Sequence, residues 1–227
     1  DVYKRQTGNC LYQERILLYM NYDSVPLRDF KELNDWETVI FVYQSALKQV
    51  ETKIDILNGE FQHRHKYNPI EHVKSRIKTP ESIVKKLKRH GYESSIENMV
   101  RYVNDIAGIR ISCSFTSDIY LIADMISKQN DLTILARRDY MKNPKKSGYR
   151  SYHMLVTTPV FLSDSIIDTK VEIQIRTVAQ DFWATLEHKM HYKFEGDGPD
   201  YITKELRECA RYVAEPVSYT HLTLPTN

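Results

Sequence analysis

The stretch from Lys170 to Thr177 reads KVEIQIRT, and its apolar and polar side chains alternate without a break. The three apolar positions are all β-branched, whereas the positions that follow them carry an acid (Glu172), an amide (Gln174) and a guanidinium (Arg176). A period of two is the spacing of a strand with one buried face. The stretch therefore predicts a strand whose polar face meets either solvent or the inside of an active site.

The rest of the chain surrounds this strand with helices and further strands. Apolar spacings of three and four predict a helix over Asn34–Gly59, with Gly59 as its end. Thr79 and Pro80 have the residue types of a helix N-cap and a first helical residue. The other predicted elements are a short helix at Ser95–Val103, a strand from Gly108 (GIRISCSF), a helix over 117–129, strands over 132–138 and 152–158, and helices over 178–190 and 203–215. We expect an α/β (α+β) fold with a mixed sheet of four or five strands flanked by helices.

Composition narrows the class of protein. The chain has 227 residues, of which 41% are hydrophobic and 27% charged, as is usual for a globular protein. No apolar run approaches the roughly 20 residues that a membrane span needs, so no membrane insertion is expected. The three cysteines are odd in number and far apart, which argues against a disulfide framework and predicts a cytoplasmic location.

The two ends share a feature at the level of DNA. DVYKRQ can be encoded as GATGTGTATAAGAGACAG, and the reverse complement of that string, read two bases in, encodes VSYTH, which occurs at 217–221. We therefore expect both ends to be translated adapter rather than part of the fold. The expected organisation is an adapter-derived segment at 1–6, an N-terminal extension at 7–33, a helix and connector at 34–66, a core at 67–194, a truncated helical region at 195–216 and a second adapter-derived segment at 217–227.

Positive charge is concentrated in two segments, although the net charge is only +2. Arg64–Arg89 contains nine Lys or Arg against two Glu, and Arg137–Arg150 contains six against one Asp. Clusters of this kind indicate either polyanion-binding sites or solvated faces.

In the first segment, Arg76 and Lys78 directly precede the helix predicted to begin at Pro80. The backbone N–H groups and the dipole at a helix N-terminus favour an anion. Ser82 and Lys86 lie four residues apart on one face of that helix. The pattern indicates a phosphate cradle or, alternatively, a solvated basic helix, and the P-loop GxxxxGK[ST] is absent.

The second segment leads into KNPKKSGYRSYH, from Lys142 to His153, where cations alternate with tyrosines. Cations suit the phosphates of a nucleotide, and Tyr149 offers a flat ring to its base. The alternative is a plain surface hairpin.

Two carboxylates complete the candidate site. Asp105 lies just before the predicted strand that carries Arg110, a position that suits a divalent-metal ligand or a simple turn residue. Glu172 lies on another predicted strand and can meet Asp105 if the two strands are neighbours. Two carboxylates with Mg²⁺ between basic phosphate sites suit nucleotidyl or pyrophosphoryl transfer, in which a carboxylate can also accept the proton of the nucleophile.

Five segments resemble, in order, the synthetase domain of the RelA/SpoT family: RIKTPESIVKKL, NDIAGIRISCSF, SGYRSYH, VEIQIRT and FWATLEHKMHYK. The resemblance covers roughly Tyr67 to Lys193, and the five segments lie within that range. The resemblance implies a nucleotidyltransferase-like synthetase domain, without room for the family's hydrolase domain. It also implies the transfer of pyrophosphate from ATP to the 3′-hydroxyl of GDP or GTP, which yields the stringent-response alarmone (p)ppGpp and AMP.

The same resemblance implies roles for individual residues. Those that would contact ATP, with the two arginines stacking on adenine, are Arg76, Lys78, Ser82, Lys86 and Arg110. Those that would contact GDP or GTP are Tyr149, Lys145, Arg138, His153, Gln174 and Glu187. Tyr149 would stack on guanine, and Asp105 and Glu172 would be the catalytic carboxylates that bind Mg²⁺, with Glu172 as base, metal ligand or both.

Some small members of the family form homotetramers and bind alarmone as an activator. The resemblance therefore implies a homotetramer with an alarmone as its allosteric ligand, although no sequence motif here marks the alarmone cleft. Two other functions stay open. A nucleotide- or single-stranded-RNA-binding regulator without catalysis would use the same basic segments, although it would not need both acids. Nucleotidyl transfer onto RNA or an antibiotic shares the metal chemistry, but its usual Asp-x-Asp pair on one strand is absent.

Overall fold

A computed structural model describes residues 35–65, 67–194 and 199–218. Within these ranges, five strands form one mixed sheet in the order β1-β2-β5-β4-β3. The central strand, β5, is parallel to β2 and antiparallel to β4, and each outer strand is antiparallel to its neighbour. The expected α+β class and mixed sheet are confirmed.

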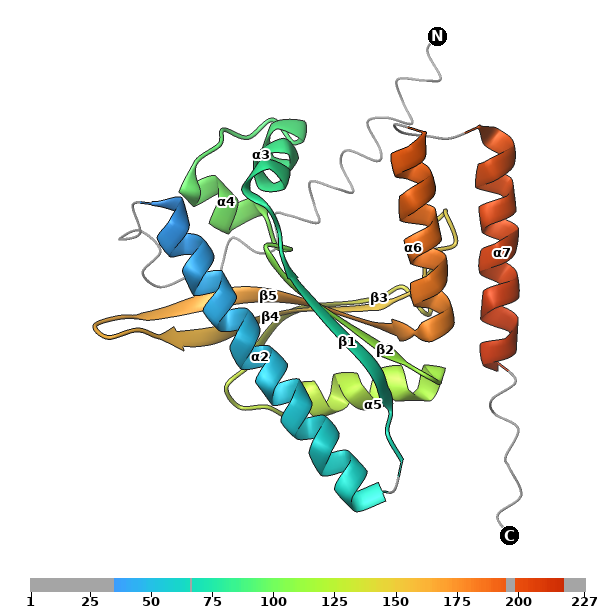
Figure 1. Cartoon of the computed structure of the whole chain (residues 1–227), viewed down its shortest axis with the longest axis horizontal. Helices are drawn as coiled ribbons and strands as arrows, with labels where there is room; N and C mark the ends of the chain where they lie inside the picture. Colours follow the sequence, from blue (N-terminus) through green and yellow to red (C-terminus); the bar gives the residue numbers. More distant parts are fainter. Residues whose placement is uncertain (1–34, 66, 195–198, 219–227) are drawn as a thin grey trace.

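The elements follow one another in the order seen in Figure 1. The strands are β1 (Ile70–Ile77), β2 (Ala107–Cys113), β3 (Thr133–Asp139), β4 (Tyr152–Phe161) and β5 (Ile166–Thr177). The helices are α2 (Trp36–His65), α3 (Pro80–Arg89), α4 (Ile96–Tyr102), α5 (Thr116–Ser127), α6 (Val178–Lys193) and α7 (Asp200–Ser218).

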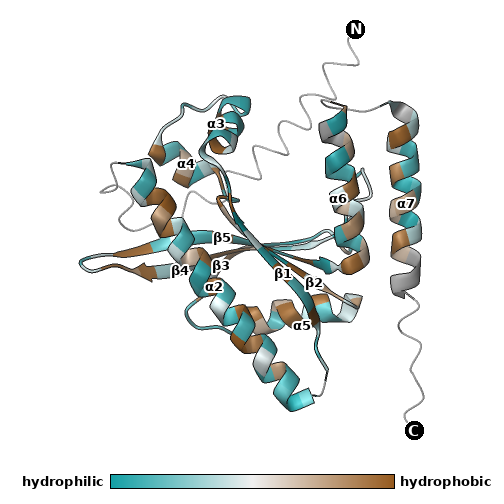
Figure 2. Ribbon diagram, in the orientation of Figure 1, coloured by the Kyte–Doolittle hydropathy of each residue, from teal (hydrophilic) through white to brown (hydrophobic). Residues whose placement is uncertain are grey.

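Two helices build the hydrophobic core with one face of the sheet. Helix α2 runs obliquely across the strands, and both α2 and α5 contact β5 (Figure 1). Three apolar residues of β5 (Val171, Ile173 and Ile175) are fully buried in one continuous cluster with apolar residues of both helices. Hydrophobic and hydrophilic residues alternate along α2 in Figure 2, as an amphipathic helix requires. The polar residues of β5 are thereby left for the opposite face of the sheet.

Local sequence signals fix the beginning of α3. The helix begins at Pro80, and the side-chain oxygen of Thr79 accepts a hydrogen bond from the backbone N–H of Ser82 at 3.3 Å. Ile83 and Leu87 are buried against the rest of the fold. The predicted N-cap and first helical residue are confirmed, and the helix therefore presents its other face, with Lys86, to the interior of the site described below.

In the N-terminal part of the described chain, one prediction was wrong and one strand was missed. Gly59 does not end α2, which continues to His65. Gly59 is exposed and a side chain there would meet nothing within 4 Å, so the helix bears only the roughly 1 kcal/mol propensity cost of one glycine. The second error is an omission: Ile70–Ile77 had no element assigned to it but forms β1, an edge strand with few buried residues.

A second, smaller apolar cluster joins the 140–149 region to α6 and α7. Its buried members are Tyr149, Trp183 and Ala210, and the Trp183 indole N–H donates to the backbone carbonyl of Leu206 at 2.8 Å. Gly148 has a φ of +96° and lies directly against Ala210. The loop before β4 is thus packed onto the C-terminal helix.

No helix among the described residues is long and apolar enough to cross a membrane. The adapter-derived segments were expected at 1–6 and 217–227. Residues 1–6 and 219–227 lie outside the described residues, while α7 takes in residues 217 and 218.

Candidate active site

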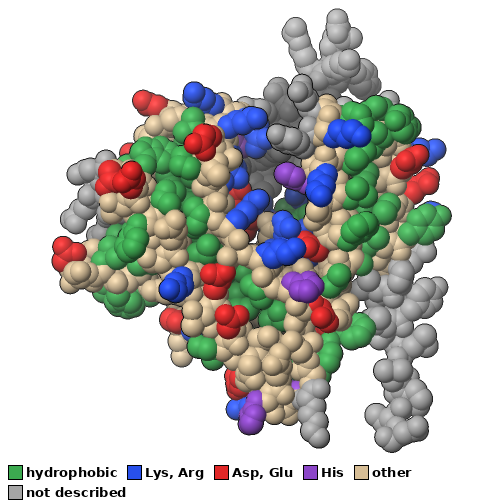
Figure 3. Space-filling model, in the orientation of Figure 1, with side chains coloured by type: hydrophobic (Ala, Val, Ile, Leu, Met, Phe, Trp, Pro, Cys, Tyr) green, Lys and Arg blue, Asp and Glu red, His purple; other side chains and the backbone are tan. Residues whose placement is uncertain are grey.

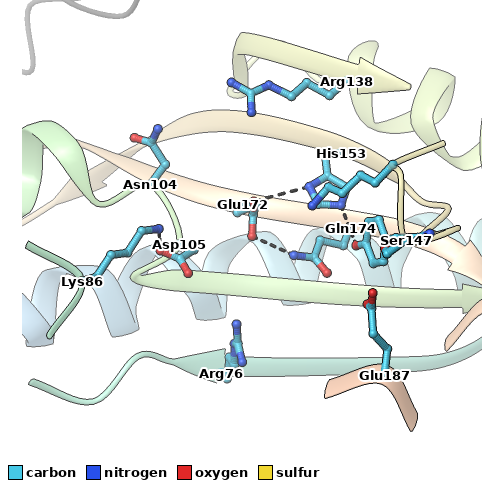
Figure 4. Close-up of a pocket in the computed structure, with 12 residues that line it drawn as sticks. Arg76, Lys86, Asn104, Asp105, Arg138, Ser147, His153, Glu172, Gln174 and Glu187 are labelled. Atoms are coloured by element: carbon cyan, nitrogen blue, oxygen red, sulfur yellow. Dashed lines mark hydrogen bonds and ion pairs between the residues drawn. The ribbon is translucent and has the colours of Figure 1, made fainter. Parts of the chain in front are cut away.

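A cavity of about 410 Å³ opens on the polar face of the sheet. Its walls come from strands β1, β3, β4 and β5, from the segments that precede β2 and β4, and from helices α3 and α6. Figure 4 shows their side chains converging on one space. The lining residues are Arg76, Lys86, Asn104, Asp105, Arg138, Lys145, Ser147, Tyr149, His153, Glu172, Gln174 and Glu187.

Strand register explains why so many polar residues meet here. Gln174 of β5 pairs with Arg110 of β2 on one side and with His153 of β4 on the other. His153 in turn pairs with Arg138 of β3. These paired residues form one polar row across four strands, and Glu172 lies two residues from Gln174 on the same face of the sheet.

At one end of the cavity, Asp105 is held by two ammonium groups. Lys78 Nζ lies 2.9 Å from one carboxylate oxygen and Lys86 Nζ lies 2.7 Å from the other. Burial raises the pKa of Asp105, but the charge of Lys86 and the hydrogen bonds from both lysines outweigh burial and lower the pKa to about 2. Asp105 is therefore ionised, and it organises two cations around itself.

In the middle of the cavity, both oxygens of Glu172 have a hydrogen-bonding neighbour. Gln174 Nε2 donates to Oε2 at 2.8 Å, and His153 Nδ1 lies 3.5 Å from Oε1. Burial raises the pKa of Glu172, but the contacts with His153 and Gln174 outweigh burial and lower the pKa overall. Burial also lowers the pKa of His153, in spite of its attraction to Glu172. The pair thus consists of a carboxylate beside a neutral imidazole.

At the other end of the cavity, two cations lie close to the ring of Tyr149. Lys145 Nζ is 4.6 Å and Arg176 Cζ is 5.3 Å from the centroid of its ring. Its hydroxyl lies 2.8 Å from His153 Nε2. Only 9% of Tyr149 is exposed, so a planar ligand can reach its ring only from the cavity. Burial raises the pKa of Tyr149, which keeps the hydroxyl protonated.

A carboxylate at the start of α6 pairs with the two arginines on this face of the sheet. Asp181 Oδ1 lies 3.2 Å from Arg110 Nη1 and 3.6 Å from Arg176 Nη1. Arg176 is 1% exposed, which is exceptional for an arginine. The contact with Asp181 directs Arg110 toward α6, so in this conformation Arg110 does not line the cavity.

Charge around the cavity is mixed, with a small excess of cations. Among the lining residues, four are Lys or Arg and three are Asp or Glu. Figure 3 shows blue side chains gathered around a central hollow between α3 and α6. A site of this kind suits a polyanion whose negative charge the protein can offset only in part.

The structure brings ten of the thirteen predicted site residues to this cavity. These are Asp105, Glu172, Arg76, Lys86, Tyr149, Lys145, Arg138, His153, Gln174 and Glu187. Lys78, Ser82 and Arg110 do not line it: Lys78 contacts Asp105, Ser82 lies in the exposed first turn of α3, and Arg110 pairs with Asp181.

Sequence reasoning missed two lining residues, Asn104 and Ser147. Asn104 accepts a hydrogen bond at 2.7 Å from Lys170 Nζ, a lysine that is only 4% exposed. Asn104 directly precedes Asp105, and Lys170 is one of the polar positions of KVEIQIRT. Their position next to predicted site residues was the only signal in the sequence that could have pointed to Asn104. The contact ties the segment that carries Asp105 to β5.

Within the described ranges, no group of three or more His, Cys, Asp or Glu residues is arranged to hold a metal by itself. The cavity does hold two ionised carboxylates, Asp105 and Glu172, and the charge of Asp105 acts to raise the pKa of Glu172. Mg²⁺ is commonly bound through one or two carboxylates, water and substrate phosphates. The donor set therefore fits Mg²⁺ that arrives with a nucleotide.

Comparison with known protein families identifies one match. Residues 75–197 match the model of the region found in RelA / SpoT proteins. The matched range contains nearly the whole sheet and every residue that lines the cavity.

Individual relatives agree with this match. The chain is 47% identical to GTP pyrophosphokinase YwaC of Bacillus subtilis over 178 residues, which is 78% of this chain and 85% of YwaC. The structure is similar to small alarmone synthetase 1 from Bacillus subtilis bound to its product pppGpp, with a TM-score of 0.76 and 32% identity over 82% of this chain and 94% of that one. The same synthetase bound to AMPCPP gives a TM-score of 0.69 and 30% identity over 81% and 92% of the two chains.

Proposed function

Since this chain belongs to the RelA/SpoT family, we propose that the cavity between α3 and α6 is where it transfers pyrophosphate. The chain is a GTP pyrophosphokinase that makes (p)ppGpp from ATP and GDP or GTP. The 3′-oxygen of the guanosine nucleotide bonds to the β-phosphorus of ATP, the bond from that phosphorus to the α–β bridging oxygen breaks, and AMP leaves. The observation that carries the proposal is the position of Glu172, a hydrogen-bonded carboxylate between two cationic ends of one cavity.

We assign the ATP site to the Asp105 end of the cavity. Arg76 and Lys86 line that end, and Lys78 is one contact away through Asp105. Arg76 and Arg110 are our candidates for stacking on adenine, a contact that suits a planar guanidinium, and Arg110 would have to turn from Asp181 to make it. Ser82, in the first turn of α3, is a candidate phosphate contact. The relative bound to AMPCPP supports an adenine-nucleotide site.

We assign the GDP or GTP site to the Tyr149 end. Lys145, Arg138 and His153 are candidate phosphate contacts, and Tyr149 offers one face of its ring to guanine. Gln174 and Glu187 line the same end and are candidate polar contacts to the acceptor. The relative bound to pppGpp supports a guanosine-nucleotide site.

We assign Asp105 and Glu172 as the residues that would hold Mg²⁺. Bound there with ATP, the ion would offset negative charge at the transferring phosphoryl groups. Glu172 is also placed to accept the proton of the 3′-hydroxyl, because its lowered pKa keeps it ionised and each of its oxygens has a second lone pair. Lys78 and Lys86 would then shift from Asp105 toward phosphate oxygens.

Two features of the protein's setting belong to the same proposal. A homotetramer that binds alarmone as an activator is carried over from small members of the family, and light scattering with and without added pppGpp tests it. A cytoplasmic location follows from the substrates, which are cytoplasmic nucleotides.

Positionally labelled ATP tests the reaction. With GDP or GTP and Mg²⁺, label in the γ-phosphate is expected in the guanosine product, and label in the α-phosphate is expected in AMP. Transfer of the α-label to the acceptor would show nucleotidyl transfer instead. Binding of nucleotide or single-stranded RNA by folded protein, without either product, would show a regulator without catalysis and would refute the proposal.

A further inference from the structure

Five side chains on the polar face of the sheet form a closed ring of polar contacts. One arm runs from Glu172 Oε2 to Gln174 Nε2 at 2.8 Å and from Gln174 Oε1 to Arg176 Nη2. The other runs from Glu172 Oε1 to His153 Nδ1 at 3.5 Å, from His153 Nε2 to the Tyr149 hydroxyl at 2.8 Å, and from that hydroxyl to Arg176 Nη2 at 3.1 Å. Both arms therefore begin at the two oxygens of Glu172 and end at one nitrogen of Arg176.

The two ends of this ring fix the direction of every hydrogen bond in it. Arg176 can only donate and an ionised Glu172 can only accept. Because Arg176 donates to Gln174 Oε1, the amide must present Nε2 to Glu172. Because Arg176 also donates to the Tyr149 hydroxyl, that hydroxyl is free to donate its own hydrogen to His153 Nε2, which leaves the imidazole hydrogen on Nδ1, toward Glu172.

The side chains of this ring are largely buried. Arg176 is 1% exposed, and the side chains of His153 and Glu172 are 15% and 23% exposed. Asp181 lies 3.6 Å from the other terminal nitrogen of Arg176 and balances its charge. Hydrogen bonds in such a poorly hydrated site polarise one another, and a buried group that loses its partner is costly.

We propose that Arg176 is a positioning residue for pyrophosphate transfer: through Gln174 on one side and Tyr149 with His153 on the other, it orients both oxygens of Glu172. Arg176 itself does not line the cavity. It also ties Tyr149, the candidate guanine platform, to the strand that carries Glu172. The catalytic part of this inference rests on the proposed function, whereas the ring itself does not.

Replacing Arg176 by Met removes both donated hydrogen bonds while keeping a long apolar side chain. We expect R176M to lower kcat about 10- to 100-fold, as loss of a residue that orients a catalytic ligand commonly does. The KM for ATP should change little, because Arg76 and Lys86 lie outside the ring. Arg137→Met is the matched control, since Arg137 lies on β3 but is exposed and donates to Ser127 of α5.

A spectroscopic measurement separates positioning from a general loss of structure. In protein with ¹⁵N-labelled histidine, the Nε2 resonance of His153, assigned with a His153→Gln variant, reports the hydrogen bond from Tyr149. Tyr149→Phe abolishes that bond and sets the reference position. We expect R176M to move the resonance toward this reference, because the Tyr149 hydroxyl loses the donor that orients it, and R137M to leave it unchanged.

Should R176M fail to fold, Arg176→Lys keeps the buried charge and serves as the second variant. An ammonium lacks the fixed planar donors of a guanidinium, so R176K should have a kcat below that of wild type and a His153 resonance between the wild-type and Tyr149→Phe positions. A wild-type kcat together with a wild-type resonance in R176K would overturn the proposal. A wild-type resonance in folded R176M would also overturn it. If wild-type protein makes no (p)ppGpp but the His153 resonance moves in R176M as expected, the proposed function is wrong and the ring of contacts is supported. If wild-type protein makes (p)ppGpp but the resonance does not move in R176M, only the role of the ring is refuted.

Discussion

Replacing Gly148 by alanine perturbs the contact between the loop before β4, which carries Tyr149, and helix α7. Gly148 has a φ of +96°, a region that L-residues rarely adopt. A Cβ at this position would lie 2.5 Å from the Cβ of Ala210 in α7 and 3.7 Å from Cζ2 of Trp183. The first contact is about 1.0–1.5 Å shorter than the roughly 3.5–4.0 Å optimum between carbons, so the loop or the helix must move.

The expected cost has two separable parts. Left-handed backbone costs a non-glycine residue about 1–2 kcal/mol, and overpacking in a filled site costs about 1–3 kcal/mol. G148A should therefore lower the free energy of unfolding by about 2–5 kcal/mol. Because Gly148 lies between Ser147 and Tyr149, which line the cavity, a shift near 1 Å should also raise the KM for GDP or GTP, and a displacement of that size can cost about 100-fold in rate.

A double-mutant cycle with Ala210→Gly isolates the overlap. A210G alone should cost about 1 kcal/mol as a helical glycine. In G148A/A210G the overlap is gone and only the backbone and propensity costs remain, so the double variant should be more stable than the sum of the single effects by about 1–3 kcal/mol. Urea denaturation measures all four proteins. Additive losses would refute the reasoning, because they would mean that the two residues do not meet.

Two further predictions concern α3 and its carboxylate partner. Thr79→Ala should lower the free energy of unfolding by about 1 kcal/mol, since it removes the acceptor for the Ser82 N–H, and Thr79→Asn should restore most of it; thermal or urea unfolding measures both. Asp105 has a folded pKa of about 2 against an ordinary value of 3.8, so its ion pairs contribute roughly 2 kcal/mol of stability above pH 4, and this is lost as the pH falls toward 2. The difference in unfolding free energy between wild type and Asp105→Asn should thus be constant from pH 7 to about pH 5 and shrink below pH 4, whereas a constant difference at every pH would contradict the assigned ion pairs.

The core of the fold was predictable because its signals are local. The β-branched alternation of β5 predicted both its buried face and its polar face, and Thr79-Pro80 predicted where α3 begins. Strand β1 gave no such signal because it is an edge strand whose side chains are mostly exposed. Since neither face of β1 is continuously buried, its apolar and polar residues do not alternate. Gly59 misled because a helix tolerates one glycine at an exposed position when its other residues are packed against the core.

Most residues of the candidate site could be predicted from the sequence, but the contacts between them could not. Residues on the polar face of one strand, such as Glu172 and Gln174, were found from alternation, but the ring that joins them to Tyr149 depends on strand register and on a loop 27 positions away from Arg176. Asp181, which turns Arg110 away from the cavity, is placed by the start of α6. Contacts of this kind arise from tertiary packing, which no local pattern encodes.

The proposed role of Glu172 in the chemical step at the cavity can be tested with the substitution Glu172→Gln. The substitution keeps the size of the side chain and removes its charge and its ability to accept a proton. With nucleotide binding measured by calorimetry and turnover by formation of (p)ppGpp, we predict binding close to that of wild type and turnover lower by about 10²- to 10⁴-fold. Turnover near that of wild type would contradict the account.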